Sequence, residues 1–124
     1  MKIEKFADRD VAKLEKKAAL ASAVLKSISN KWRLLILCHL VKGEKSVGEI
    51  HELVDLSQSA LSQHLAVLRE TKLVKTRRES QAIFYSVRGS EVPILLNALY
   101  DIYCAPPTKV DAPAGAVVKG RKAS

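Results

Sequence analysis

The most constraining stretch of this sequence is residues 46–71, which predict two short helices separated by a tight turn. Ser46 opens the tetrapeptide S-V-G-E. In such a capping box, the Ser46 and Glu49 side chains accept hydrogen bonds from each other's backbone N–H groups. Ser57 can cap a second helix over 58–71. Two helices joined by so short a connection form a helix-turn-helix.

The segments on either side complete a larger fold. Helical spacing of apolar residues predicts helices over 10–28, 31–42 and 91–104, with Asn30 and Ser90 as caps of the last two. Residues 73–87 instead alternate apolar and polar side chains, which predicts a β-hairpin with its tip at 79–81. The order α-α-α-α-β-β-α is mainly α with one hairpin. It predicts a winged helix-turn-helix with an additional helix at each end.

This order divides the chain into three parts. Residues 1–9 are expected to be an N-terminal extension, and 10–104 the winged helix-turn-helix domain. Residues 105–124 are rich in Ala, Pro, Gly and Lys without periodicity, which predicts a disordered basic tail. In the first helix, apolar or small residues follow a heptad spacing that suits a close helix–helix seam between two copies: Val11, Leu14, Ala18, Ala21, Leu25 and Ile28. Packing of this helix on its own domain is the alternative.

The helix over 58–71 distributes its side chains in an unusual way. Three leucines share one side and anchor it: Leu61, Leu65 and Leu68. The remaining surface carries amides, hydroxyls and an imidazole, with almost no acids: Gln58, Ser59, Ser62, Gln63 and His64. Short hydrogen-bonding side chains let a helix sit deep in the DNA major groove. There, Gln can pair with adenine, and Ser can act as a hydrogen-bond donor or acceptor. With Ser57 at its start, near N–H groups suited to phosphate, this helix predicts a DNA-reading face.

Charge points to the same partner. The net charge is +8 and the isoelectric point about 9.7, which favours a polyanion such as nucleic acid. Arg77 and Arg78 lie near the hairpin tip, where they could reach phosphates or the minor groove. The alternative interpretation is that these basic residues form a solvent-exposed surface with no nucleic-acid partner.

At this point the chain resembles a known family, the ArsR/SmtB family of dimeric bacterial winged-helix repressors. Three stretches carry the resemblance: NKWRLLILCHLVKGEKSVGEI, LSQSALSQHLAVLRETKLV and TRRESQAIFYSV. The resemblance covers roughly residues 15–104. It implies a homodimer built on the first and last helices, double-stranded operator DNA as partner, and an inducer that weakens operator binding.

Many members of this family sense metals, but the sequence departs from their patterns. Where one kind of site has a Cys-x-Cys pair, the chain has Ser46-Val47-Gly48. The last helix offers Asp101 but no His. Zinc-like metals need thiolates or imidazoles in groups of about four, so we predict no metal site and no cofactor. A metal-responsive repressor using His51, Asp55 or the tail is the alternative.

The two cysteines suggest another signal. LLILCHL, which contains Cys38, and Tyr103-Cys104 resemble the family's sulfide-responsive and biofilm-associated subgroup. That resemblance implies a disulfide or polysulfide link between Cys38 and Cys104, formed by reactive sulfur or an oxidant, which relieves repression. Which of the two cysteines reacts first stays open. Lys42 favours a thiolate at Cys38, whereas LLILCHL looks buried, and burial disfavours one. Two inert core cysteines are the alternative.

Other classes of protein fit less well. A small thiol oxidoreductase normally carries CxxC, and the chain has none. A winged-helix protein-interaction module would present apolar anchors rather than Ser and Gln. No apolar run is long enough to span a membrane, and residues 1–30 lack the apolar centre of a signal peptide. We therefore expect a cytoplasmic regulator that is not an enzyme and has no membrane partner.

Overall fold

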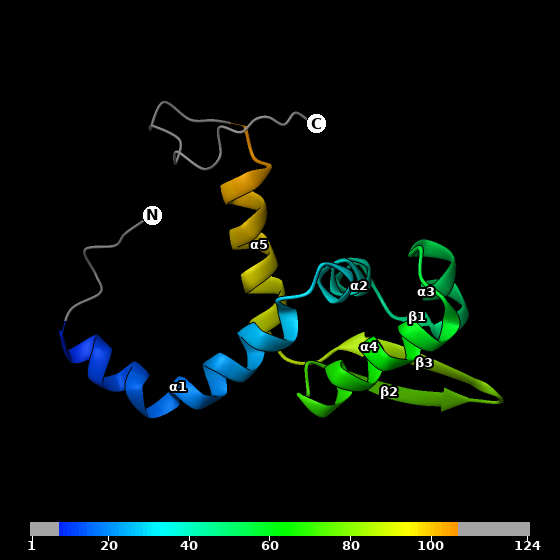
Figure 1. Cartoon of the computed structure of the whole chain (residues 1–124), viewed down its shortest axis with the longest axis horizontal. Helices are drawn as coiled ribbons and strands as arrows, with labels where there is room; N and C mark the ends of the chain where they lie inside the picture. The colour runs from blue at the N-terminus through cyan, green and yellow to red at the C-terminus, as the bar shows by residue number, and fades with distance from the viewer. Residues whose placement is uncertain (1–7, 107–124) are drawn as a thin grey trace. The chain divides into compact units, whose positions relative to one another are not determined.

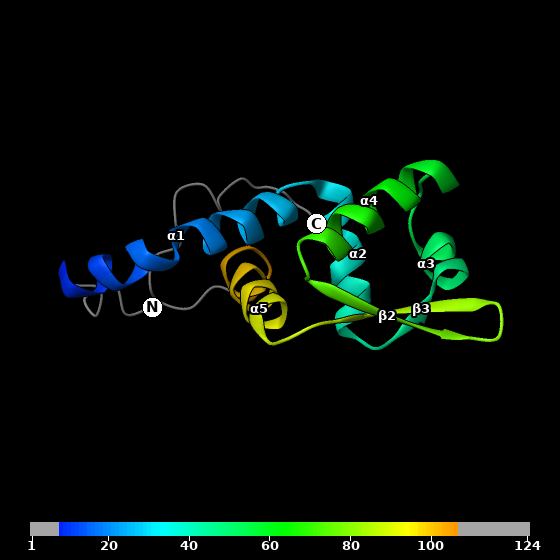
Figure 2. The same ribbon diagram turned by 90° about the horizontal axis from the view of Figure 1, so that it is seen from below.

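The computed structural model describes residues 8–106, which form five helices and three short strands (Figures 1 and 2). The chain divides into two compact units, Met1–Arg88 and Gly89–Ser124. The predicted extension, 1–9, and the predicted tail, 105–124, lie almost wholly outside the described residues.

Four helices belong to the first unit: α1 (Asp8–Ile28), α2 (Lys31–Val41), α3 (Val47–Leu53) and α4 (Gln58–Glu70). The bounds of α1, α2 and α4 agree with the predicted ranges to within two residues. Figures 1 and 2 show α2, α3 and α4 gathered beside the hairpin, while α1 extends away from them. The predicted helix-turn-helix is the pair α3–α4.

Local capping explains why these helices begin where they do. The Asn30 side chain accepts hydrogen bonds from the backbone N–H groups of Trp32 and Arg33, at 2.9 and 3.1 Å. Ser46 and Glu49 form the reciprocal capping box, at 2.8 and 3.1 Å. Each cap satisfies N–H groups that have no partner within the helix. Both capping predictions are confirmed.

The wing is a three-stranded antiparallel sheet in the order β1-β3-β2. Its strands are β1 (Lys45–Ser46), β2 (Val74–Glu79) and β3 (Ala82–Val87). The hairpin register joins Val74 to Val87 and Glu79 to Ala82. Sequence analysis missed β1 because two residues are too few to show an alternating pattern.

The core of the first unit forms where the helices meet the sheet. Its most deeply buried side chains come from α2, α3 and α4: Ile36, Leu37, Ile50, Leu61 and Leu68. The expectation that LLILCHL is buried is wrong for Cys38, which is exposed. Cys38 shares an outward stripe with the exposed Leu35 and Val41, at helical spacings of three. A helix that is apolar on most sides does not reveal which side meets the core, so its periodicity could not show this.

The second unit contains α5 (Glu91–Tyr103). The prediction that Ser90 caps this helix is wrong, because its side chain makes no capping hydrogen bond. Its backbone lies at φ −108° and ψ −4° rather than in the extended conformation of an N-cap. Four large apolar side chains of α5 are exposed: Ile94, Tyr100, Ile102 and Tyr103. Within residues 8–106, no helix is both long and apolar enough to cross a membrane.

Candidate nucleic-acid interface

Helix α4 has one buried and one exposed side, as its sequence predicted. Leu61, Leu65 and Leu68 are buried and fasten the helix to the core. Ser59, Ser62 and Gln63 are exposed. The exposed side therefore presents hydroxyl and amide groups that can donate and accept hydrogen bonds, on a helix whose other side is fixed by packing.

The first turn of α4 is held by Ser57, whose hydroxyl accepts a hydrogen bond from the Ala60 backbone N–H at 3.1 Å. The Ser57 and Ser59 hydroxyl oxygens lie 3.4 Å apart. The first turn has no acidic residue. An N-terminal turn with this charge pattern favours an anion such as phosphate.

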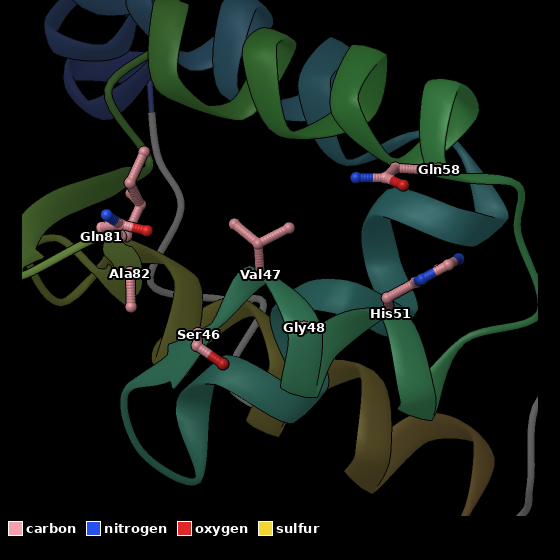
Figure 3. Close-up of a pocket in the computed structure, with 8 residues that line it drawn as sticks. Ser46, Val47, Gly48, His51, Gln58, Gln81 and Ala82 are labelled. Atoms are coloured by element: carbon pink, nitrogen blue, oxygen red, sulfur yellow. The ribbon is translucent and has the colours of Figure 1, made fainter.

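A groove of about 370 Å³ separates the start of α4 from the tip of the wing. Figure 3 shows the Gln58 amide on one side of it, Gln81 on the other, and Val47 rising between them. Its other lining residues come from α3 and the wing: Ser46, Gly48, His51, Ala82 and Ile83. Gln58 thus faces the wing, a placement that its position in the sequence did not indicate.

His51, considered above as a metal ligand, has a structural contact. Its Nε2 lies 3.0 Å from the carbonyl oxygen of Leu56, which can only accept, so Nε2 carries the proton. This bond ties α3 to the turn that precedes α4. Within residues 8–106, no cluster of three or more His, Cys, Asp or Glu side chains could hold a metal ion.

His64 differs from the other predicted DNA-facing residues because it is half-buried. Its Nδ1 lies 3.2 Å from an Nη1 nitrogen of Arg33, on α2. Burial, and then the positive charge of Arg33, lower the pKa of His64 below its ordinary value of 6.5. The neutral imidazole is therefore favoured, with Nδ1 as the acceptor. Nothing in the local sequence pointed to Arg33, which is 31 positions away.

The two arginines of the wing lie in different surroundings. Arg77 makes a two-pronged ion pair with Glu44, at 2.7 and 2.9 Å, and a third bond of 3.0 Å with Glu79. Its guanidinium also lies 4.6 Å from the centre of the Phe84 ring. Hydrogen bonding by Arg77 lowers the pKa of Glu44. Arg78 is exposed on the neighbouring position of β2. Sequence analysis missed Glu44 as a partner because it precedes Arg77 by 33 residues.

The two cysteines lie in different units of the chain. Cys38 is on α2 in the first unit, and Cys104 directly follows α5 in the second. Both are exposed, which gives a reactive sulfur species access to each thiol. Their predicted link stays a prediction. His39, next to Cys38, is half-buried.

Comparison with known proteins supports this description of the fold. Residues 30–76 match the family described as "Bacterial regulatory protein, arsR family". The transcriptional activator HlyU of Vibrio cholerae is 46% identical over 100 residues, covering 81% of this chain and 93% of HlyU. The crystal structure of the transcriptional repressor BigR from Xylella fastidiosa superposes with a TM-score of 0.72 at 43% identity, covering 77% of this chain and 97% of BigR.

A more distant structure, the homodimeric winged helix-turn-helix DNA-binding domain Mb0332 of Mycobacterium bovis, superposes with a TM-score of 0.62 at 29% identity. The match covers 77% of this chain and 85% of that domain. The predicted winged helix-turn-helix fold is confirmed. The chain belongs to the ArsR family, in the subgroup of HlyU and the biofilm-associated repressors, and is a DNA-binding transcriptional regulator rather than an enzyme.

Proposed function

We propose that this chain is a homodimeric repressor that reads operator DNA with α4 and releases it when Cys38 and Cys104 become linked. The observation that carries the proposal is the exposed row of Ser59, Ser62 and Gln63 on a helix fastened by three buried leucines. Such a row can enter a major groove without the long or acidic side chains that would keep a helix out.

Each predicted DNA-facing residue other than His64 has a role in this proposal. Gln63 reads a base edge, and Ser59 and Ser62 contact bases or phosphate. Ser57 and the first turn of α4 bind phosphate. Gln58 contacts DNA from the side of α4 that faces the wing. Arg78 contacts phosphate or the minor groove. Arg77 holds the wing, because its guanidinium is already engaged with Glu44 and Glu79.

The homodimer would use α1 and α5. Large apolar residues on both helices are exposed, among them Leu25 at 57%, Ile94 at 63% and Tyr103 at 70%. Exposed apolar surface of this kind marks an interaction site. The homodimeric state of the M. bovis domain supports the same assembly. Two-fold symmetry predicts a palindromic operator with half-sites about one helical turn apart. The protein would bind this DNA in the cytoplasm.

The inducer would be a reactive sulfur species or an oxidant. Converting two thiols into a disulfide releases two protons and two electrons, which the oxidant accepts; a polysulfide link also incorporates sulfur from its donor. Exposure of both thiols supports this role, since a sensor cysteine must be accessible. A link that favours the state unable to bind DNA by about 3 kcal/mol would lower affinity about a hundredfold.

The test is a gel shift on the promoter DNA upstream of the chain's own gene. Reduced protein, persulfide-treated protein and the treated Cys38→Ser variant are compared, and intact mass spectrometry counts the sulfur atoms added. We expect reduced protein and the variant to bind, and treated wild-type protein to lose about a hundredfold in affinity.

The outcomes separate the parts of the proposal. No specific binding by reduced protein would contradict the regulator's action on its own promoter. Binding that persists after both cysteines are modified would mean that their modification does not regulate DNA binding. Release by zinc rather than by persulfide would favour the metal-responsive alternative.

A further inference from the structure

Four polar side chains join the end of α1 to α2 and α4. Ser27 is only 2% exposed, although it lies on a helix whose other residues are mostly exposed. Its hydroxyl oxygen lies 3.0 Å from that of Thr71, the C-cap of α4. Its backbone carbonyl accepts a hydrogen bond of 2.6 Å from Nε of Arg33. The same guanidinium reaches His64 in the middle of α4.

The directions of these bonds follow from the chemistry of the groups. A guanidinium can only donate, so Ser27 and His64 both act as acceptors toward Arg33. Thr71 donates back to the Val67 carbonyl at 3.0 Å, which leaves its oxygen able to accept from the Ser27 hydroxyl. Each group in the cluster therefore has a partner of the right polarity. A half-buried network of this kind is specific in geometry because any rotation leaves a polar group unpaired.

Leucine packing and this polar cluster constrain α4 in different ways. Leu61, Leu65 and Leu68 press the helix against the core, but dispersion contacts depend weakly on direction. Hydrogen bonds weaken steeply when their angle changes. His64 directly follows Gln63, so a bond that fixes His64 also fixes the angle at which Gln63 leaves the helix.

We propose that Arg33 is a positioning residue for DNA reading. It holds the rotation of α4 about its axis through His64, using the Ser27 carbonyl at the end of α1 as its second support. The inference rests on the proposed function, because it concerns the helix that is proposed to read bases. It assigns His64 to positioning rather than to direct contact with DNA.

The test uses Arg33→Lys, which keeps the positive charge but cannot bond to Ser27 and His64 together in the fork geometry of arginine. We expect operator affinity to fall about tenfold, while affinity for random DNA stays within about twofold and its salt dependence is unchanged. Arg69→Lys, the same exchange at an exposed arginine of α4, is the matched control and should bind like wild type.

Two further variants test the route through His64. His64→Leu removes the acceptor and should reduce operator affinity as Arg33→Lys does, with little added loss when the two are combined. His64→Gln supplies an amide oxygen as acceptor and should restore most of the affinity. Because these changes leave the Arg33–Ser27 bond intact, they keep the inference testable if thermal melts show Arg33→Lys to be unfolded.

The results that would overturn the inference differ from those that would overturn the function. Absence of specific binding by wild-type protein contradicts the proposed function. Wild-type affinity in Arg33→Lys, or in His64→Leu, contradicts positioning alone. Equal losses on operator and random DNA, with a smaller salt slope, would show instead that Arg33 touches phosphate.

Discussion

Helices α4 and α1 carry similar apolar spacings but meet different surroundings. In α4, three leucines at helical spacing are buried, with Leu61 fully covered. In α1, Leu14 and Leu25 both belong to the heptad pattern of apolar residues and are 47% and 57% exposed. An apolar stripe thus shows that one face of a helix favours burial, but it does not show what will cover that face.

The two ends of α1 repeat this contrast within one helix. Its last residues, Ser27 and Ile28, are buried, and Ser27 is bonded to Thr71 and Arg33. Residues 11–20 are exposed throughout. One end of α1 is therefore part of the domain, while the other offers its apolar side to a second copy in the proposed homodimer.

The largest expected effect is on folding. Leu61→Ala in α4 should lower the free energy of unfolding by about 2–5 kcal/mol, because it leaves a cavity in the core. Leu14→Ala in α1 should change it by a smaller amount that grows with protein concentration, since this residue would be covered only in the proposed homodimer. Urea denaturation at several concentrations measures both. Equal, concentration-independent losses would show that α1 is covered within its own chain.

The next effect concerns the exposed side of α4. Gln63→Ala should weaken operator binding by about 1–3 kcal/mol and relax the base preference at one position of each half-site. Fluorescence anisotropy on the operator and on single-base variants measures this. If affinity for random DNA falls by the same factor, Gln63 does not read a base.

The two arginines of the wing allow a paired test, because Arg77 forms ion pairs with carboxylates and Arg78 is exposed. Arg78→Ala should weaken binding to all DNA and lower the slope of log affinity against log salt by about 0.9, the loss of one phosphate contact. Arg77→Ala should leave that slope nearly unchanged, because Glu44 and Glu79 already pair with Arg77. The opposite pattern in titrations from low to high salt would exchange the roles of the two arginines.

The smallest effect is on the pH dependence of stability. The pKa of His64 is lowered in the folded state, so below pH 6.5 the unfolded chain binds more protons than the folded one. The free energy of unfolding should therefore decrease as pH falls through 6.5, and at pH values well above 6.5 it should be independent of this group. His64→Gln should remove this pH dependence of the free energy of unfolding, as measured by denaturant titrations between pH 7.5 and 5. An unchanged pH profile in the variant would exclude His64 as its source.

The parts of the fold that sequence analysis predicted depend on neighbours close in the chain. The side chains of Asn30, Ser46 and Ser57 accept hydrogen bonds from N–H groups two or three residues ahead. The residue type at each position was therefore sufficient to predict the cap. Ser90 has a suitable side chain, but its backbone conformation prevents capping. The exposure of Cys38 was missed because α2 is apolar on more sides than the core can cover.

By itself, the sequence determined the order of the five helices and the β-hairpin, the polar side of α4 and the family. Each of these follows from spacing or capping over a few residues, or from similarity along the chain. Tertiary structure decided that Arg77 holds the wing through Glu44, that Arg33 reaches His64, and that the Cys38 thiol is accessible. These contacts join positions about thirty residues apart, or depend on which side of a helix meets the core. Local preference carries no information about them, because a side chain finds such partners only when the chain has packed.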